Sequence, residues 1–351
     1  MANYTPVVPN LYATWRSYSE RWAAGIGVNA PFGLKTIWPA DGPLRYVTTD
    51  SDLRIVQYSP TIAFRVNDRF MVGGGIAYTT GKASLKSAVD VGGLNFVLSG
   101  GPFVAAPDGE QELEGNGDGV GADVGVLFKP KDGHAVAVSY RSDVKIGIKG
   151  KTHLRGLSNE SAGLFGGDQY ATDTKTTITL PPSVTVGYAY SPNKWTLAVD
   201  GEWVGYSSFH DTTLTFSGES DANRLGVLGS NNPIPRLYKD KWSVGAGANY
   251  RWNDRWQSRA GYYFYPAVVG ESTWDPSIPD SDTHGVNIGG SWVGHPVAFD
   301  FSYSYLRYQP RSINNNVGAS AGTTINGKYK TSASIFSFNI NYKFAGAGRG
   351  R

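Results

Sequence analysis

Apolar and polar residues alternate with a period of two along most of this chain, in segments of about ten residues. In the clearest segment, 134–149, one face carries Val136, Val138, Tyr140, Val144, Ile146 and Ile148, and the other carries Ser139, Arg141, Asp143, Lys145 and Lys149. Successive side chains of a β-strand point to opposite faces. The pattern therefore predicts a strand with one apolar face and one polar face.

The same alternation recurs in later segments. Apolar faces are formed by Ile178, Leu180, Val184, Val186, Tyr188 and Tyr190, by Trp195, Leu197, Val199 and Trp203, by Phe299, Phe301, Tyr303 and Tyr305, and by Phe336, Phe338, Ile340, Tyr342 and Phe344. Turn-forming residues separate such segments. About thirteen strands are predicted, near 8–16, 20–30, 52–67, 69–87, 117–129, 134–150, 175–191, 194–216, 236–252, 255–268, 283–294, 296–312 and 328–344.

The links between these strands alternate in length. Short links such as Asn67-Asp68 and Asn253-Asp254 alternate with long ones at 31–51, 88–116, 151–174, 217–235, 269–282 and 313–327. Tyrosine and tryptophan gather at the ends of segments, as at Trp242 and Trp256. Both features are typical of an all-β, transmembrane antiparallel barrel of the bacterial outer membrane. A soluble β-sandwich or propeller is the alternative, and the number of strands with one apolar face favours the barrel.

The barrel is expected to occupy 1–344, with 345–351 as a flexible tail. Single-chain bacterial barrels have an even number of strands, so the odd count suggests one further strand before residue 8. Residues 1–9 read MANYTPVVP and contain no secretory signal. The sequence therefore predicts that the start has been trimmed or lies downstream of the natural one.

Composition narrows the class of protein further. No stretch approaches the roughly 18 consecutive apolar residues of a membrane helix. The chain has no cysteine, which excludes a disulfide framework and a cysteine-based metal or redox site. The 32 basic and 29 acidic residues are spread along the whole chain, which argues against nucleic-acid binding. We expect a monomer without cofactor or metal.

An enzyme is the rival class, because some outer-membrane barrels are lipases that use serine and histidine. The histidines are His134, His153, His210, His284 and His295. All lie in turns or at strand ends, and none has a nucleophile and an orienting acid at a recognisable spacing. The sequence therefore predicts no catalytic site. An adhesin or purely structural barrel is a third class, which loops without apolar residues would favour.

Five sequence words carry a resemblance to a known family. They are VVPNLYATW at 7–15, APFGLKT at 30–36, YRSDVKIGIKG at 140–150, LPPSVTVGY at 180–188 and SIPDSDTHG at 277–285. Over nearly its full length the chain resembles the FadL family of outer-membrane transporters of fatty acids and hydrocarbons. One departure is Thr283, where many relatives carry an arginine.

The resemblance implies a fourteen-strand barrel with an N-terminal hatch in its lumen. The resemblance places the start of this sequence at the family's second strand, so the hatch and the first strand would be absent. The implied function is passive uptake: external loops capture a hydrophobic molecule, a deeper site receives it, and a kinked strand releases it sideways into the bilayer. Long-chain fatty acids are the expected substrate, and monoaromatic hydrocarbons are the alternative. Outer-membrane lipid and lipopolysaccharide are the expected surroundings.

The two longest loops supply a candidate capture groove. The 88–116 loop is unusually apolar for an exposed segment, and the 151–174 loop adds further apolar residues. The candidate ligand-binding residues are Leu94, Phe96, Leu98, Phe103, Leu164 and Phe165. The alternative is that these side chains only pack the two loops together, and a groove needs such a packed floor as well.

Lys82 lies near the position where the family places a cation that faces the ligand carboxylate. A buried ammonium group could form a charge-assisted pair with such a carboxylate. Counting by twos from Ile76 and Tyr78 instead places Lys82 on the outer face, unless a bulge shifts the register. Both readings stay open on the sequence.

Charged and strand-breaking residues give two further hypotheses. Alternation directs a set of charged residues inward, which favours a lumenal ion-pair network: Arg65, Arg141, Asp143, Asp200, Glu202, Arg259 and Asp300. The second predicted strand is interrupted by Gly25, Gly27, Asn29 and Pro31. Proline donates no ladder hydrogen bond and glycine leaves no side chain in the wall, so a lateral exit is predicted there. The alternative is an ordinary barrel bend.

Overall fold

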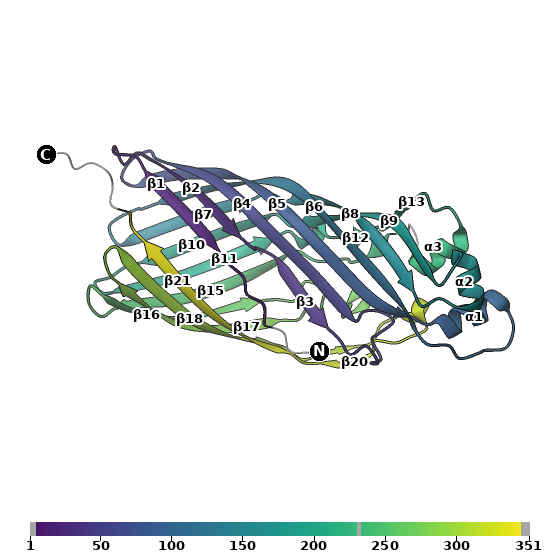
Figure 1. The fold of residues 1–351 in the computed structure, drawn as a ribbon. Helices are drawn as coiled ribbons and strands as arrows, with labels where there is room; N and C mark the ends of the chain where they lie inside the picture. Colours follow the sequence, from purple (N-terminus) through teal and green to yellow (C-terminus); the bar gives the residue numbers. More distant parts are fainter. Residues whose placement is uncertain (1–4, 230–232, 345–351) are drawn as a thin grey trace.

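A computed structural model of the chain describes residues 5–229 and 233–344, and shows one long antiparallel sheet that curls into a barrel wall (Figure 1). The wall strands are β1 (Leu11–Arg16), β2 (Trp22–Asn29), β3 (Gly33–Ile37), β4 (Asp50–Arg65), β5 (Phe70–Val89), β6 (Gly109–Phe128), β7 (His134–Arg141), β8 (Val144–Arg155), β9 (Gln169–Leu180), β10 (Ser183–Tyr190), β11 (Trp195–Val204), β15 (Lys241–Arg251), β16 (Trp256–Tyr265), β17 (Thr283–Val293), β18 (Val297–Tyr308) and β21 (Ser332–Tyr342). Three long strands of the wall are each divided by a short irregular segment, into β2 and β3, β7 and β8, and β9 and β10. Each such pair counts as one crossing of the wall. About thirteen crossings result in the described chain, as the alternation predicts.

Shorter elements lie in the external loops. They are α1 (Val91–Ser99), α2 (Asn159–Phe165), α3 (Ala222–Leu228), the 3₁₀ turns Tyr206–Ser208, Glu271–Thr273 and Ala319–Ala321, and the short strands β12 (Asp211–Thr212), β13 (Thr215–Ser217), β14 (Ile234–Pro235), β19 (Arg311–Ile313) and β20 (Gly327–Tyr329). Figure 1 shows α1, α2 and α3 together at one end of the barrel, beyond the long strands β5, β6, β8 and β9. The short turns lie at the other end. No helix in the described part of the chain is long and apolar enough to cross a bilayer.

The two loops predicted to be longest are shorter in the structure than the sequence predicts. Strand β6 starts at Gly109 and β9 starts at Gln169, so the connections are 90–108 and 156–168 instead of 88–116 and 151–174. The added strand ends carry charged residues on one face and few apolar residues on the other, as in GEQELEGN at 109–116. Without an apolar face they lack the alternation that marks a membrane strand. They are held instead by neighbours on both sides, since β6 pairs with β5 and β8.

The halves of the strands nearer the short turns, which we call the lower halves, carry the predicted apolar outer face. Ile62, Val124 and Val286 have exposed fractions of 60%, 52% and 54% on the outside of the wall. Aromatic side chains follow this band toward the helix end, where Tyr58 and Tyr78 lie opposite each other on β4 and β5. The band is therefore a lipid-facing surface bordered by an aromatic girdle.

The faces of β8 and β9 differ from the prediction. Val144, Ile146 and Ile148 are buried inside the barrel, together with Leu180, although the alternation places them on the same face as Tyr140. Between β7 and β8, Ser142 and Asp143 together oppose the single residue Ala122 of β6, so the strand contains one extra residue, and one extra residue exchanges the two faces of a strand. Pro181-Pro182 has the same effect between β9 and β10. Lys145 and Lys149, predicted inside with Arg141, are therefore exposed outside.

Three buried apolar clusters organise the interior. One lies among the external helices and contains Leu154 and Phe165. A second joins the loops 38–49, 266–282 and 309–331 around Trp274. The third lines the inside of the wall around Ile55 and Ile146.

The face exchange in β8 predicts a labelling pattern. Because the natural chain has no cysteine, single variants Lys145→Cys and Ile146→Cys can be compared directly. A membrane-impermeant maleimide added from outside should modify Lys145→Cys at least about tenfold faster, because burial limits access to a thiol. Mass spectrometry of the intact protein measures the rates. Faster labelling of Ile146→Cys would mean that the alternation continues unbroken through Ser142.

Candidate functional site

The external helices are fixed by local capping and by contacts between the helices. Asp90 caps α1 by accepting a hydrogen bond from the Gly93 amide at 2.8 Å. The Asn95 side chain of α1 accepts a bond from the Ser161 amide of α2 at 2.8 Å. Arg224 of α3 donates to the Leu164 carbonyl of α2 at 2.8 Å. The three helices therefore form one connected external layer.

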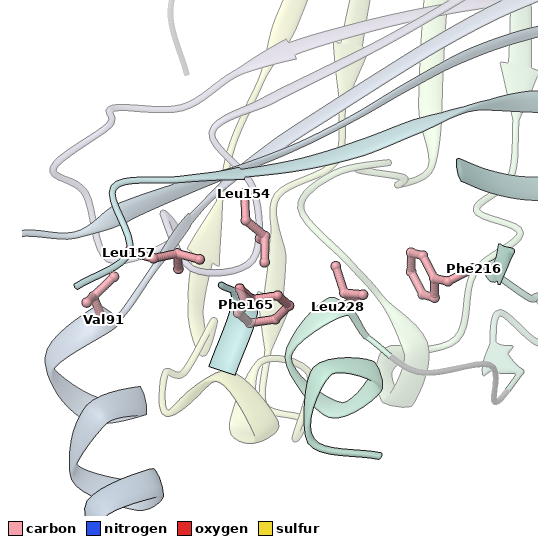
Figure 2. Packing of buried hydrophobic residues seen from close by; sticks show 6 residues of the cluster. All are labelled: Val91, Leu154, Leu157, Phe165, Phe216 and Leu228. Carbon is pink, nitrogen blue, oxygen red and sulfur yellow. The ribbon is translucent and has the colours of Figure 1, made fainter. Parts of the chain in front are cut away.

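The floor of this layer is closely packed. The side chains of Val91, Leu154, Leu157, Phe165, Phe216 and Leu228 converge under the helices (Figure 2). Phe165 is 4% exposed and Leu157 is 4% exposed, so both act as packing residues. Leu164 packs against the same cluster and is partly buried. For Phe165 the structure therefore supports the packing alternative.

Apolar side chains on α1 and on the segment that follows it face outward. Phe96 and Phe103 are 46% and 60% exposed, and their rings meet edge to face with centroids 6.4 Å apart. Val97 and Val104 beside them are 75% and 63% exposed. Leu94 and Leu98 are half-buried. An exposed apolar patch of this kind, which we call the α1 patch (Phe96, Val97, Phe103 and Val104), is typical of a binding surface.

The inner face of β8 connects the external cluster with the interior. Leu154, Thr152, Ile148 and Ile146 all point inward and are at most 2% exposed. The hydroxyl groups of Thr152 and Thr174 form a hydrogen bond with each other at 2.7 Å. The line of side chains is therefore apolar or internally hydrogen-bonded over its whole length.

A cavity lies at the lower end of this line, at the level where the three strands are interrupted. Its volume is about 450 Å³. Its lining comes from the β2–β3 interruption, from β7, from the β9–β10 interruption, from β11 and the turn after it, and from the start of β1: Asn29, Ala30, Pro31, Phe32, Arg141, Pro181, Ser183, Glu202, Val204, Tyr206, Asn10 and Tyr12. Phe32 also packs against the inner cluster of Ile55 and Ile146. Each face exchange therefore occurs beside the cavity.

The wall is discontinuous next to this cavity. In the described residues β3 pairs only with β4, whereas β2 lies between β1 and β4. A side chain on Gly27 would place its Cβ 3.1 Å from the Tyr12 ring, so glycine lets that ring approach the wall closely. The buried Oδ1 of Asn29 has no hydrogen-bond partner in the part of the chain that the structure describes. The residues predicted as a lateral exit, Gly25, Gly27, Asn29 and Pro31, thus lie beside a wall edge that faces a cavity.

The charged residues predicted to face inward form separate pairs instead of one network. Arg141 pairs with Asp123 at 3.2 Å, and Arg259 pairs with Asp300 at 3.3 Å. Asp300 also accepts a bond from Asn341 at 2.6 Å. The other predicted members are Arg65, Asp143, Asp200 and Glu202, and no ion pair joins them among the described residues. Sequence analysis missed Asp123, although its alternation with Val120 and Val124 in the predicted strand 117–129 would have placed it on the inner face.

Lys82 lies outside the barrel. It is exposed, and its neighbours across the ladder are Arg54 and Asn116. No bulge shifts the register between Ile76 and Lys82, so the count by twos holds. The expectation of a ligand-facing ammonium group at this position is therefore wrong. Arg141 is the cation that lines the cavity.

Burial changes the ionisation of two groups near the barrel mouth. Tyr206, which lines the cavity, has its pKa raised to about 12 by burial, so its hydroxyl stays protonated and can donate a hydrogen bond. Burial also raises the pKa of Asp280, whose carboxylate accepts bonds from the amides of Val268 and Val269 at 2.8 and 3.0 Å. Asp280 thus holds the 266–282 loop in place. No cluster of possible metal ligands occurs among the described residues.

Comparison with known proteins gives consistent matches. A family model described as "Outer membrane protein transport protein (OMPP1/FadL/TodX)" matches residues 1–344. The long-chain fatty acid transport protein of Escherichia coli strain K12 is 23% identical over 97% of this chain and 78% of its own length. Outer membrane protein P1 of Haemophilus influenzae strain Rd is 21% identical over 96% of this chain and 75% of its own length.

Solved structures show the same fold. A FadL homologue of Pseudomonas aeruginosa superposes with a TM-score of 0.82 at 19% identity, covering 96% of this chain and 78% of that chain. The toluene transporter TbuX of Ralstonia pickettii superposes with a TM-score of 0.67 at 18% identity, covering 96% of this chain and 81% of that chain.

Proposed function

This chain belongs to the outer membrane transport family described as OMPP1/FadL/TodX, and on that premise we propose that it takes up long-chain fatty acids by capture on the α1 patch and lateral release beside β2. The family membership makes the chain a bacterial outer-membrane barrel that transports hydrophobic compounds and is not an enzyme. The substrate and the route are the parts that we propose.

One observation carries the proposal: apolar residues extend from the α1 patch, through the cluster under the helices and the inner face of β8, to the cavity at the β2–β3 interruption. An acyl chain gains about 0.8 kcal/mol for each methylene group that leaves water. A series of apolar surfaces therefore guides such a chain better than a water-filled pore. Because β8 is tightly packed, passage requires side chains along this line to move.

The cavity favours a substrate with a carboxylate. Arg141 can donate two parallel hydrogen bonds to a carboxylate, and the protonated Tyr206 hydroxyl can donate a further one. Glu202 lines the same cavity, and Asp123 competes for Arg141, so the ligand has to displace one ion pair. Monoaromatic hydrocarbons are the second candidate, supported by the likeness to a toluene transporter in fold.

The α1 patch can be tested by the double variant Phe96→Ser with Phe103→Ser. Both rings are exposed, so the barrel should fold normally, while oleate affinity should fall by about tenfold or more because each ring covered by a ligand contributes about 1.5 to 3 kcal/mol. Isothermal titration in detergent measures the affinity. Val66→Ser, at the turn end, is a control with 53% exposure and should bind oleate normally. Unchanged affinity in the folded double variant would show that capture occurs elsewhere.

The lateral exit can be tested by Gly27→Val with Asn29→Val. The added side chains should press on the Tyr12 ring and fill the wall edge, leaving oleate binding intact but strongly lowering uptake into cells, because the release path would be closed. Uptake of labelled oleate by cells expressing each variant measures this. Gly187→Val, where the Cβ meets nothing closer than 3.8 Å, is the matched control. Normal uptake by the folded double variant would exclude this exit.

The substrate class can be tested by Arg141→Gln. Loss of the cation should weaken oleate binding by about tenfold, the usual value of a charge-assisted hydrogen bond, and should leave toluene uptake unchanged. Arg259→Gln is the matched control, because Arg259 pairs with Asp300 away from the cavity lining. Fatty-acid binding in Arg141→Gln equal to the natural protein, together with saturable toluene uptake, would favour the hydrocarbon function.

A further inference from the structure

A single row of basic residues crosses the outer face of β4, β5, β6, β8 and β9. We call this part of the barrel, which has the longest strands, the tall side. The ladder places Arg54 on β4 opposite Lys82 on β5, then Asn116 on β6, Lys149 on β8 and Lys175 on β9. All five are exposed. We call these four cations and one amide the basic row. Neighbouring strands lie about 4.8 Å apart, so the row places four positive charges on five adjacent strands, with the Asn116 amide between the two pairs.

The row contains like charges placed directly opposite each other. Lys149 faces Lys175, and Arg54 faces Lys82. Like charges in directly opposed positions destabilise a sheet. Arg54 is compensated by Asp52 at 2.7 Å, but Lys82, Lys149 and Lys175 form no ion pair within residues 5–229 and 233–344.

The rows nearer the helices are arranged differently. There Lys86 pairs with Glu112 at 2.8 Å, and Arg155 pairs with Glu110 at 2.9 Å and with Glu112 at 2.8 Å. Each cation of these outer rows has a carboxylate on the adjoining strand. The basic row thus lacks the compensation that the same strands supply a few residues farther out, and an anion from outside the chain can provide it.

The position of the row relative to the membrane indicates which anion from outside the chain it meets. Lys82 lies four residues beyond Tyr78 on β5, which is about 13 Å along the strand from the aromatic girdle. Below the girdle, Ile76 on β5 and Val124 on β6 face the acyl chains of the bilayer, with exposed fractions of 57% and 52%. On β5 the row therefore lies at the level of the headgroups of the outer leaflet, and because barrel strands are tilted it extends farther toward the helix end on β8 and β9.

A polar hollow adjoins the row. It has a volume of about 270 Å³ and is lined by Lys151, Tyr170, Ala171, Thr172, Asp173, Ser217 and Gly218. Lys151 is two residues from Lys149 on the same face of β8. The hollow offers an ammonium group, hydroxyl groups and a carboxylate within reach of the row, which suits a phosphorylated sugar better than a simple acyl lipid.

We propose that the basic row, with Lys151 and its adjoining hollow, binds the phosphate groups of lipopolysaccharide in the outer leaflet. Each lysine ammonium donates to phosphate oxygens, and the sugar carrying the phosphate lies toward the hollow. The acyl chains of the same molecule cover the apolar wall below the Tyr58 and Tyr78 girdle. This interaction is independent of which substrate the barrel transports, and it gives one side of the barrel a fixed lipid neighbour.

The test is a binding measurement with defined saccharolipids. The natural protein and the triple variant Lys82→Gln, Lys149→Gln and Lys175→Gln are titrated in detergent with deep-rough lipopolysaccharide that carries its lipid A phosphates, and with the same lipid after enzymatic dephosphorylation. Since each surface lysine near an anionic lipid contributes about a factor of five, the triple variant should bind about 100-fold more weakly. The dephosphorylated lipid should bind both proteins equally weakly.

A charge-matched control separates the row from net charge. The variant Lys129→Gln, Lys131→Gln and Lys343→Gln removes three exposed lysines at the turn end and should bind like the natural protein. Heat-modifiable gel migration checks that all variants fold. Three results would overturn the proposal: unchanged affinity in the row variant, equal loss in the control variant, or equal competition by phosphatidylglycerol micelles.

Discussion

The structure depends on one constraint, which is that backbone N–H and C=O groups facing hydrocarbon must all be hydrogen-bonded. A closed ladder meets it, and each interruption of a ladder has to face something other than lipid. The gap between β2 and β3 faces the cavity. At the break in β7–β8, the Ser142 amide donates a hydrogen bond to the Ala122 carbonyl, and the Ser142 hydroxyl accepts one from the Ala122 amide. At the break in β9–β10, the Pro182 carbonyl accepts a hydrogen bond from the Gly205 amide. Inside the wall the ladder is thus interrupted at the level of the cavity, while the outer edges of β1 and β21 have no strand partner among the described residues.

The interruptions also decide what the two halves of the barrel are made of. Below them, β7 and β10 present apolar side chains to lipid, as a barrel must. Above them the same alternation continues, but the faces are exchanged, so that Ile146 and Leu180 form a dry interior and lysines face outward. The upper half is therefore built like a water-soluble sheet with its own core, and it can carry helices and loops that the lower half could not support.

Sequence reasoning recovered the strands because period-two alternation is the direct consequence of a lipid face. It failed where that cause is absent: the ends of β6 and β9 extend beyond the membrane, so residues such as Glu110 and Gln169 look like loop. The face exchange between β7 and β8 could not be read from the alternation of apolar residues, because Val144 and Ile146 keep the even spacing of Val138 and Tyr140. The only sequence sign of an irregularity at this level was Pro181-Pro182 between β9 and β10.

The candidate site was only partly accessible from sequence. The apolar content of α1 pointed to an external binding surface, and Gly27 and Pro31 pointed to an irregular strand. The cavity could not be predicted, because its lining comes from segments as far apart as Asn10 and Tyr206, and Arg141 acquires its partner Asp123 only in the folded ladder. Such contacts follow from register, and register is set by the length of every turn before it. The extra residue at Ser142 and Asp143 therefore sets the phase of the whole tall side: if the full-length chain ran straight through this point, the even spacing of Tyr140 and Ile146 would turn the upper part of β8 inside out, with isoleucines toward water and lysines in the core.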